Sequence, residues 1–403
     1  MMTTTVLLGV AAMLPLPVQG EPVFAREIAK LTTSSLESRY EKTYGTKMPH
    51  PTGADVYKLN YPSPNSPHGF QRLSGALFVP TGVRPRGLVL FFHGTSVKPE
   101  TVPSRMPDTS IESALPFLAQ GFAVTMPDYV GQGDSKGRHP YPLGKINAWS
   151  GIDMVPHARR TAARQGWHLG DNLFISGYSE GGAVAMWATR HLQERPELGL
   201  KLRASAPLSG PYDLSRTTAR SMAADVESAV WRAVRVFLVG YIGYSAVAWV
   251  PGFKLEDYFV PSFASYIPLA FETSQSDDEI TQRLVVKAIQ IRPITRSIKP
   301  ILQPSFTRAL ETADRRNPLI NVLAENDAYD WAPQTSMLLV ALEKDQVVVP
   351  QNTTVAISAM RARGVPESRV RAVMIPDDLN HITGVPKCTL LAAEFFVRHA
   401  ANE

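Results

Sequence analysis

The stretch Phe174-Ile-Ser-Gly-Tyr-Ser179-Glu-Gly-Gly-Ala-Val184 decides the fold class. It holds the pattern Gly-x-Ser-x-Gly between an apolar run that suits a buried strand and a run that suits a helix. A strand that turns sharply into a helix while presenting a serine leaves no room for large side chains beside it, which explains the glycines. The helix start then places backbone N–H groups beside the serine oxygen. This context predicts that Ser179 is a nucleophile; an idle serine in a glycine-rich turn is the alternative.

Strand-like and helix-like runs alternate along most of the chain, which is typical of a parallel sheet with crossover helices. The expected strands are Leu73–Val79, Gly87–Phe92, Phe122–Met126, Asn172–Ser176, Ala204–Leu208, Met337–Leu342 and Val370–Ile375. The expected helices are Ile111–Gln120, Asn147–Gln165, Gly182–Glu194, Thr353–Gly364 and Thr389–His399. Several strand runs are apolar throughout, as expected where helices cover both faces of a sheet. We predict an α/β fold with a mostly parallel central sheet and flanking helices.

The alternation stops between about Asp213 and Pro333. This segment has a helical pattern and is far longer than the crossover of a dozen or so residues that neighbouring parallel strands need. Inside it, Trp231–Val250 is strongly apolar, but its two arginines and two glycines favour a buried or cleft-lining helix over a membrane span. We expect residues 213–333 to form an inserted helical cap between two parts of one core, 71–212 and 334–403. Residues 21–70 are expected to be a lead-in with few constraints.

A serine hydroxyl becomes a good nucleophile only when a base takes its proton and an acid orients that base. In a strand–turn–helix site these partners follow the serine in the order acid, then histidine. Three histidines follow Ser179. His191 lies along the helix that the serine opens, and His399 lies near the end of the C-terminal helix. His381 lies in a loop after the last expected strand and is therefore the predicted base.

The predicted acid is Asp345, because it directly follows the apolar run Met337–Leu342 and so falls at the carboxyl end of a strand. Other carboxylates remain as alternatives: Asp327, Asp330, Asp377 and Asp378. The first two precede the strand, and the last two lie so close to His381 in sequence that they are poorly placed to orient its ring.

The tetrahedral intermediate of acyl transfer carries a negative charge that needs hydrogen-bond donors. The apolar run Gly87–Phe92 ends in His93-Gly94-Thr95, where one donor arises in this architecture, and the residue after the nucleophile supplies the other. The backbone N–H groups of Thr95 and Glu180 are the predicted oxyanion hole. His93 is expected to brace the loop.

Composition and the absence of certain motifs argue against several other classes of function. The 403 residues hold 41 Lys and Arg against 36 Asp and Glu, and this net charge of +5 is too small and too dispersed to indicate a nucleic-acid partner. The one cysteine, Cys388, excludes an intrachain disulfide and a cysteine-based zinc site. The sequence has no zinc-protease, calcium-loop or nucleotide-binding motif, so we expect no metal ion and no organic cofactor.

The N-terminus predicts export. Residues 6–14 form an apolar core too short to span a bilayer, and Val18 and Gly20 are small residues before a possible cleavage point. The usual basic start is missing, so a disordered or docked tail is the alternative. We predict a signal peptide over residues 1–20 and a secreted or periplasmic protein.

Several motifs now combine: His93-Gly94-Thr95, Pro127-Asp-Tyr-Val-Gly-Gln-Gly133-Asp-Ser, His139-Pro140-Tyr141, the Gly177–Gly182 turn, Trp331-x-Pro333 and the His381 loop. With them, the chain from about residue 71 to 400 resembles the α/β-hydrolase superfamily, most of all its secreted lipase and esterase branch. The resemblance implies that Ser179 is the nucleophile, Asp345 the acid and His381 the base. One departure is that the family usually has His-Gly-x-x-Asp where this chain has Ala341-Leu-Glu-Lys-Asp345.

The predicted function is therefore hydrolysis of a carboxylic ester through an acyl-enzyme. The cap would supply a hydrophobic pocket, with Phe237, Tyr241 and Tyr244 as its candidate lining, which favours a lipase or medium-chain esterase. The expected partner is a small-molecule or lipid-like ester. A serine peptidase or amidase on the same fold is the first alternative, and a non-catalytic binding protein of that fold is the second. The sequence leaves the oligomeric state open.

Overall fold

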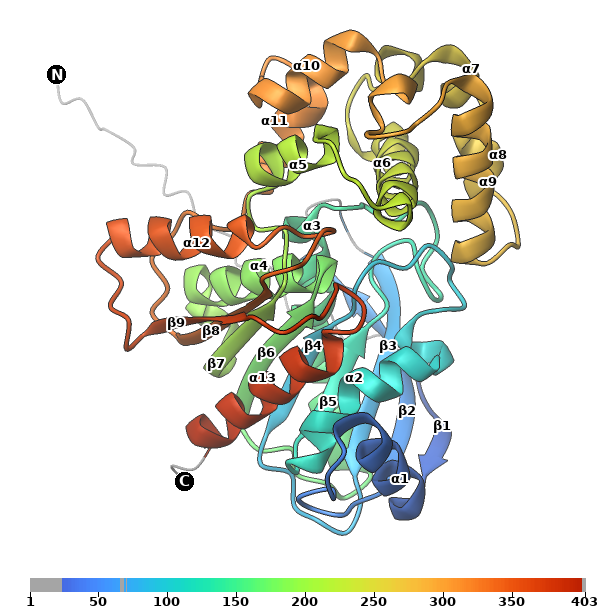
Figure 1. The fold of residues 1–403 in the computed structure, drawn as a ribbon. Helices are drawn as coiled ribbons and strands as arrows, with labels where there is room; N and C mark the ends of the chain where they lie inside the picture. Colours follow the sequence, from blue (N-terminus) through green and yellow to red (C-terminus); the bar gives the residue numbers. More distant parts are fainter. Residues whose placement is uncertain (1–23, 66–68, 70, 401–403) are drawn as a thin grey trace, which may run out of the picture.

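The computed structural model describes residues 24–65, 69 and 71–400, and the predicted signal peptide lies outside them. Within these residues one sheet of nine strands has the order β1-β2-β3-β5-β4-β6-β7-β8-β9 (Figure 1). The strands are β1 Phe24–Leu31, β2 Ala54–Ser63, β3 Gln71–Pro80, β4 Leu88–Phe92, β5 Ala123–Pro127, β6 Asn172–Tyr178, β7 Lys201–Leu208, β8 Ser336–Leu342 and β9 Val370–Ile375. Neighbours from β5 to β9 are parallel, and β1, β2 and β3 add antiparallel pairs. The mostly parallel sheet predicted from the sequence is confirmed.

Helices cover both faces of this sheet, which is why its central strands are apolar throughout. One face carries α3 (Gly144–Arg164), α4 (Glu180–Glu194) and α12 (Gln351–Ala362), and the other carries α1 (Thr33–Tyr44), α2 (Asp108–Ala119) and α13 (Val385–Ala400). Alternate residues of β4 serve the two cores: Leu88, Leu90 and Phe92 pack on the first face, and Val89 and Phe91 on the second. The five helices expected between the strands all form, with ends shifted by a few residues.

The N-terminal segment contributes more than a lead-in with few constraints, and that prediction was wrong. β2 pairs with β3 along all ten of its residues, and β1 extends the sheet by one more strand. From Tyr57 to Tyr61 the strand alternates apolar and polar residues, and its polar Lys58 and Asn60 contact Asp134 on a neighbouring loop. This period of two is the usual signal of a strand, and the prediction overlooked it.

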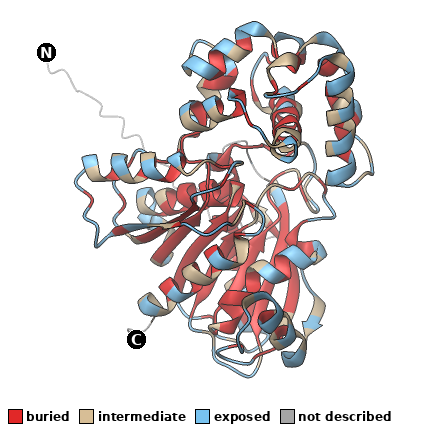
Figure 2. Cartoon of the chain, in the orientation of Figure 1, coloured by how far each residue is buried: buried red, intermediate tan, exposed pale blue. Residues whose placement is uncertain are grey.

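Between β7 and β8 the chain leaves the sheet and forms a helical insertion (Figure 1). Its elements are the π-helical turn η3 (Leu214–Thr218), α5 (Ala219–Ala223), α6 (Ala229–Trp249), η4 (Leu255–Asp257), α7 (Pro261–Ala264), α8 (Ile267–Phe271), α9 (Asp277–Ile291), η5 (Lys299–Ile301), α10 (Pro304–Thr312) and α11 (Pro318–Glu325). The insertion packs around an apolar cluster of its own, and its outer faces are exposed (Figure 2). The predicted helical character of this segment is confirmed.

Helix α6 is the apolar run for which the sequence left two interpretations. Among the described residues it is the one helix long and apolar enough to cross a membrane by length and composition. However, 56% of its most apolar window is buried inside the protein. Burial of this extent is what a packed helix of the insertion requires.

Candidate active site

Ser179 lies at the sharp turn between β6 and α4. Its backbone has φ 61° and ψ −123°, a conformation that residues with a side chain rarely adopt. Glycines make the turn possible, because a Cβ atom at Gly177 would collide with the carbonyl of Gly181, and one at Gly181 would collide with that of Phe92. Helix α4 begins at the next residue, Glu180, so its N-terminal end faces the serine. The strand–turn–helix arrangement expected around Ser179 is present.

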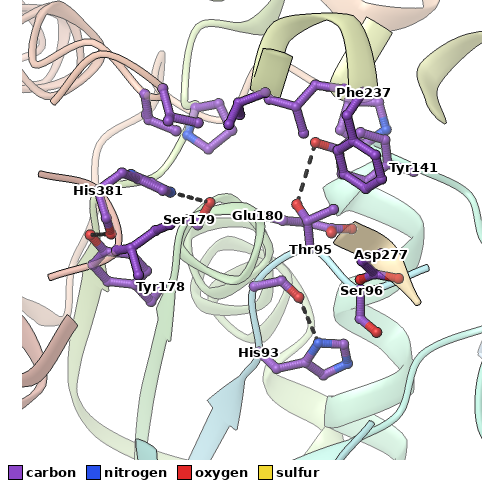
Figure 3. Close-up of a pocket in the computed structure, with 18 of the residues that line it drawn as sticks. His93, Thr95, Ser96, Tyr141, Tyr178, Ser179, Glu180, Phe237, Asp277 and His381 are labelled. Carbon is purple, nitrogen blue, oxygen red and sulfur yellow. Dashed lines mark hydrogen bonds between the residues drawn. The ribbon is translucent and has the colours of Figure 1, made fainter. Parts of the chain in front are cut away.

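Ser179, His381 and Asp345 form a continuous chain of hydrogen bonds. His381 Nε2 lies 2.7 Å from Ser179 Oγ (Figure 3). On the other side of the ring, His381 Nδ1 lies 2.6 Å from Asp345 Oδ2. Because a carboxylate only accepts, Nδ1 carries the ring proton and Nε2 is left to accept the serine proton. Asp345 Oδ1 accepts hydrogen bonds from the backbone N–H of Val347 and Val348, both at 2.9 Å. These bonds hold the carboxylate in one orientation toward the ring.

The other carboxylates considered from the sequence have different partners. Asp377 pairs with Lys387, Asp378 with Lys344, and Asp330 with Arg363, while Asp327 accepts hydrogen bonds from Ser215. The other two histidines are also placed elsewhere, His191 against Trp149 and Trp187, and His399 against Phe395. The structure thus brings Asp345 alone of these acids to His381.

Tyr178 supports the histidine loop, a role that the sequence analysis missed. Its hydroxyl donates to the carbonyl of His381 at 2.6 Å, and its ring packs against the imidazole. Burial raises the pKa of Tyr178, so its hydroxyl keeps the proton that this bond needs. Its position beside the nucleophile was the available signal, but nothing local points from residue 178 to residue 381.

The predicted oxyanion donors both line the cavity next to Ser179 (Figure 3). Among the described residues, neither the backbone N–H of Thr95 nor that of Glu180 donates a hydrogen bond to a protein group, so both are available to a bound oxygen. His93 braces the turn before Thr95, with Nδ1 2.7 Å from the Gly94 carbonyl, and Tyr129 donates to the His93 carbonyl at 2.8 Å. Burial lowers the pKa of His93, which therefore stays neutral.

A cavity of about 730 Å³ opens in front of Ser179 and His381. It lies between the sheet and the insertion, since residues of both line it (Figure 3). The side chains that the insertion contributes are predominantly apolar, among them Met222, Trp231, Val234, Phe237, Leu238 and Phe306. Such a lining suits the hydrocarbon part of a ligand.

Of the three aromatic residues predicted to line this pocket, Phe237 does, but the prediction was wrong for Tyr241 and Tyr244. Tyr241 is buried against Tyr141, with ring centroids 4.6 Å apart, and Tyr244 lies under the guanidinium of Arg138. Six residues of α6 line the cavity: Trp231, Val234, Phe237, Leu238, Val239 and Ile242. Tyr241 lies on the same side of the helix, one turn after Phe237, but its ring is buried against Tyr141 and its hydroxyl donates to the Ser96 carbonyl.

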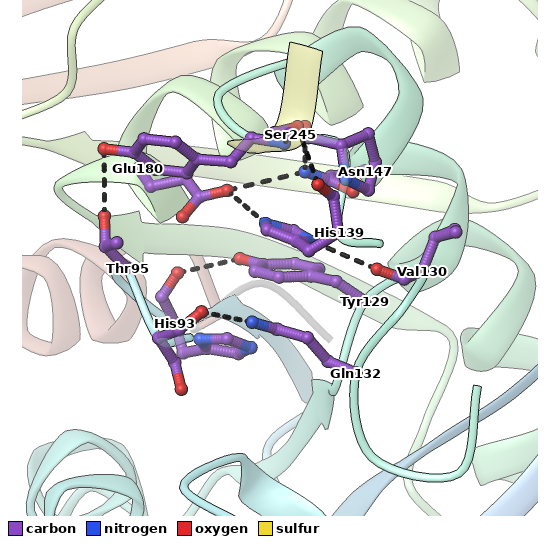
Figure 4. Close-up of polar contacts among 12 residues, drawn as sticks. His93, Thr95, Tyr129, Val130, Gln132, His139, Asn147, Glu180 and Ser245 are labelled. Carbon is purple, nitrogen blue, oxygen red and sulfur yellow. Dashed lines mark hydrogen bonds and ion pairs between the residues drawn. The ribbon is translucent and has the colours of Figure 1, made fainter. Parts of the chain in front are cut away.

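A second contact that the sequence did not predict joins Glu180 to His139 (Figure 4). The two residues lie 41 positions apart, and no periodic pattern links them. The available signal was an acidic residue directly after the nucleophile together with a histidine in the His139-Pro140-Tyr141 motif.

No group of three or more His, Cys, Asp or Glu side chains that could hold a metal ion occurs within the part of the chain that the structure describes.

Comparison with known proteins agrees with this fold. Residues 96–212 match the secretory lipase family. A structure described as a hydrolase from Legionella pneumophila is 25% identical, with a TM-score of 0.82, and the match covers 95% of this chain and 99% of that one. The chain has the α/β-hydrolase fold.

Two more distant structures share this fold. The rice cell wall degrading esterase LipA from Xanthomonas oryzae has 22% identity and a TM-score of 0.79, over 95% of this chain and 100% of that chain. Candida antarctica lipase A has 11% identity and a TM-score of 0.61, over 92% and 83%. No curated protein matches the sequence. The match of residues 96–212 to the secretory lipase family supports a hydrolase of the lipase and esterase type, and these neighbours support the fold.

Proposed function

We propose that the protein is a serine carboxylic ester hydrolase that acts through an acyl-enzyme on hydrophobic esters. The observation that carries the proposal is the Ser179–His381–Asp345 hydrogen-bond chain at the wall of a largely apolar cavity. The match to the secretory lipase family also supports an extracellular or periplasmic location.

Acylation begins when Ser179 Oγ attacks the ester carbonyl and His381 Nε2 takes its proton. Asp345 keeps the ring in the required tautomer and stabilises the imidazolium that forms. The carbonyl oxygen becomes an oxyanion, which the backbone N–H groups of Thr95 and Glu180 bind. His381 then gives the proton to the departing alcohol, and the acyl group stays on Ser179.

Deacylation repeats these steps with water as the nucleophile. His381 takes a proton from water, the hydroxide attacks the acyl carbonyl, and the proton returns to Ser179 as the acid leaves. Because the triad is fixed to the carboxyl ends of β6 and β8 and to the loop after β9, the same geometry serves both steps.

The cavity supports a hydrophobic substrate. Its apolar wall comes from α5, α6 and α10 of the insertion, whereas the triad comes from the core. An acyl or alcohol chain that enters this space exchanges water for apolar side chains, at roughly 25 cal/mol for each Å² buried. The insertion would thus act as the cap that selects the ester.

A series of chromogenic esters with acyl chains of increasing length tests this proposal, with the matching anilides as amide substrates. We expect turnover of the esters, with a preference for chains longer than acetyl, and loss of turnover in Ser179→Ala. Faster hydrolysis of the anilides would replace the esterase assignment by an amidase. No Ser179-dependent turnover of either series would contradict catalysis by this site.

A further inference from the structure

Directly beside the nucleophile, two ionisable side chains are buried against each other. Glu180 is 3% exposed and His139 is 4% exposed, and His139 Nε2 lies 2.8 Å from Glu180 Oε1 (Figure 4). Glu180 comes from the first turn of α4, and His139 from the loop between β5 and α3. The proposed triad makes no use of either side chain, although the backbone N–H of Glu180 belongs to the proposed oxyanion hole.

The hydrogen bonds of His139 determine how many protons this pair holds. The other ring nitrogen, Nδ1, lies 3.0 Å from the carbonyl oxygen of Val130, and a carbonyl only accepts, so Nδ1 must carry a proton. The contact between Nε2 and Glu180 then needs a second proton, on the ring as imidazolium or on the carboxyl group. In both cases the pair carries one shared proton and no net charge.

The groups that surround the pair determine what the loss of the shared proton would cost. Three tyrosines, Tyr129, Tyr141 and Tyr241, pack around the His139 ring, and burial raises the pKa of each, so all three stay neutral. The ring of neutral His93, after the end of β4, stacks on Tyr129, which in turn stacks on His139. The buried Asp128 carboxyl group interacts electrostatically with His93. From α3, Asn147 Nδ2 makes a long contact of 3.5 Å with Glu180 Oε1.

Glu180 Oε2 has no hydrogen-bond partner among the described residues, so Oε1 and its contacts to His139 and Asn147 hold the carboxyl group. Without the shared proton, a bare carboxylate would lie in a water-poor site next to the developing oxyanion. Two like charges in such a site oppose each other strongly.

The pair also connects the insertion to the oxyanion amide. Ser245 of α6 donates its hydroxyl to the carbonyl of His139 at 2.8 Å and accepts the backbone N–H of Tyr141 at 2.8 Å. Through His139 the position of α6 is therefore linked to the first turn of α4, where the Glu180 amide lies.

We propose that His139 and Glu180 are a positioning pair that shares one proton, keeps the first turn of α4 electrically neutral, and so lets the Glu180 amide stabilise the oxyanion. The inference rests on the proposed ester-hydrolase function. In this role His139 acts through Glu180, because the proton that they share neutralises the Glu180 carboxylate.

A double-mutant cycle tests this role. His139→Ala should lower kcat by about 10²–10³-fold, the range seen when an oxyanion donor is lost, with a much smaller change in KM. Adding Glu180→Gln to His139→Ala removes the unpaired carboxylate and should restore kcat at least about tenfold. A double variant that is as slow as His139→Ala, or slower, would overturn the proposal, because His139 would then be only a structural brace.

The pH dependence of kcat in the same two variants distinguishes an effect of the Glu180 charge from an effect of lost packing. An effect of charge should disappear where the carboxyl group is neutral, so the ratio of kcat between the double and single variants should approach one at low pH. A ratio that does not change with pH would contradict the charge-based role. Glu194→Gln, a Glu-to-Gln change at the exposed end of α4, is the matched control and should alter neither kcat nor this ratio.

The tautomer of His139 gives a readout that does not depend on activity. ¹⁵N NMR of the full-length Ser179→Ala protein should show a protonated Nδ1 on His139. An unprotonated Nδ1 would overturn the shared proton even if esters are hydrolysed. Conversely, a protonated Nδ1 in a protein that hydrolyses no ester would refute the proposed function but leave the pair intact.

Discussion

The sheet and the insertion meet at one cavity but are built differently. On the sheet side, backbone hydrogen bonds between parallel neighbours fix the strand ends that carry Ser179 and Asp345, and Ser179 N–H itself donates to the carbonyl of Leu208. On the insertion side, helices pack through side chains around a separate apolar cluster. Contacts such as those of Ser245 on α6 with His139 and Tyr141 of the core join the two parts.

This difference indicates that the sheet and the insertion have different roles in the site. A group that must hold sub-ångström geometry is best placed on a hydrogen-bonded strand end, whereas a wall that only needs shape and hydrophobicity can be built from helix side chains. We therefore expect changes on the sheet side to slow hydrolysis of every ester. Changes on the insertion side should alter which ester is preferred.

After the nucleophile itself, the largest of these effects is expected at Asp345. Asp345→Asn keeps the shape but stabilises the wrong tautomer of His381, and kcat should fall about 10⁴-fold, as in known triads. Because the defect lies in the triad, short and long acyl chains should lose equally. Steady-state kinetics over the ester series provides the measurement, and the exposed Asp378→Asn is the matched control. A near-silent Asp345→Asn would show that another group orients His381.

A smaller and selective effect is expected from α6. Val234→Trp adds bulk to the cavity face and should lower kcat/KM for long-chain esters about tenfold or more relative to acetyl esters. Val247→Trp places the same change on an exposed position of the same helix and should leave the selectivity unaltered. Equal losses for all chain lengths in Val234→Trp would mean that α6 supports the core instead of selecting the substrate.

The smallest effect concerns stability at the base of the insertion, where its first and last segments meet. Burial, with a lesser contribution from the nearby Asp213 carboxylate, raises the pKa of Asp327 from 3.8 to about 6 against the hydrogen bonds from Ser215. Because the folded-state pKa is the higher one, the folded protein binds more protons between these values, and stability falls as pH rises through about 6. Asp327→Asn should therefore raise the free energy of unfolding at pH 7 by about 1–3 kcal/mol and have little effect near pH 4.

Chemical denaturation of both proteins at the two pH values measures this difference. An equal effect of Asp327→Asn at pH 4 and pH 7 would mean that ionisation of this carboxyl group does not influence folding. Loss of stability at both values would mean that the Ser215 contact needs a carboxylate.

The parts that the sequence predicted share a physical basis. Strands such as β4 and β6 are buried on both faces, so they appear as apolar runs, and the turn at Ser179 needs glycines for steric reasons. The positions of Asp345 and His381 followed from chain order alone, because the carboxyl ends of parallel strands meet at one edge of the sheet.

The parts that escaped prediction depend on long-range side-chain contacts. The Glu180–His139 contact spans 41 residues without a periodic signal. β2 is different, because the alternation from Tyr57 to Tyr61 was a local signal that the prediction overlooked. On α6 the apolar pattern predicted a buried helix correctly, but all of its faces are apolar. Packing against Tyr141 and Arg138, which the sequence does not reveal, decided which face meets the cavity.

The central claim is that Ser179 is the nucleophile of this site, and covalent labelling tests it most directly. Intact-mass and peptide mass spectrometry after treatment with a fluorophosphonate should show one adduct per chain, located on Ser179. A folded Ser179→Ala protein should take up none and lose on the order of 10⁶ in kcat. An adduct on another residue, or a folded Ser179→Ala protein that keeps most of its ester hydrolysis, would contradict the account.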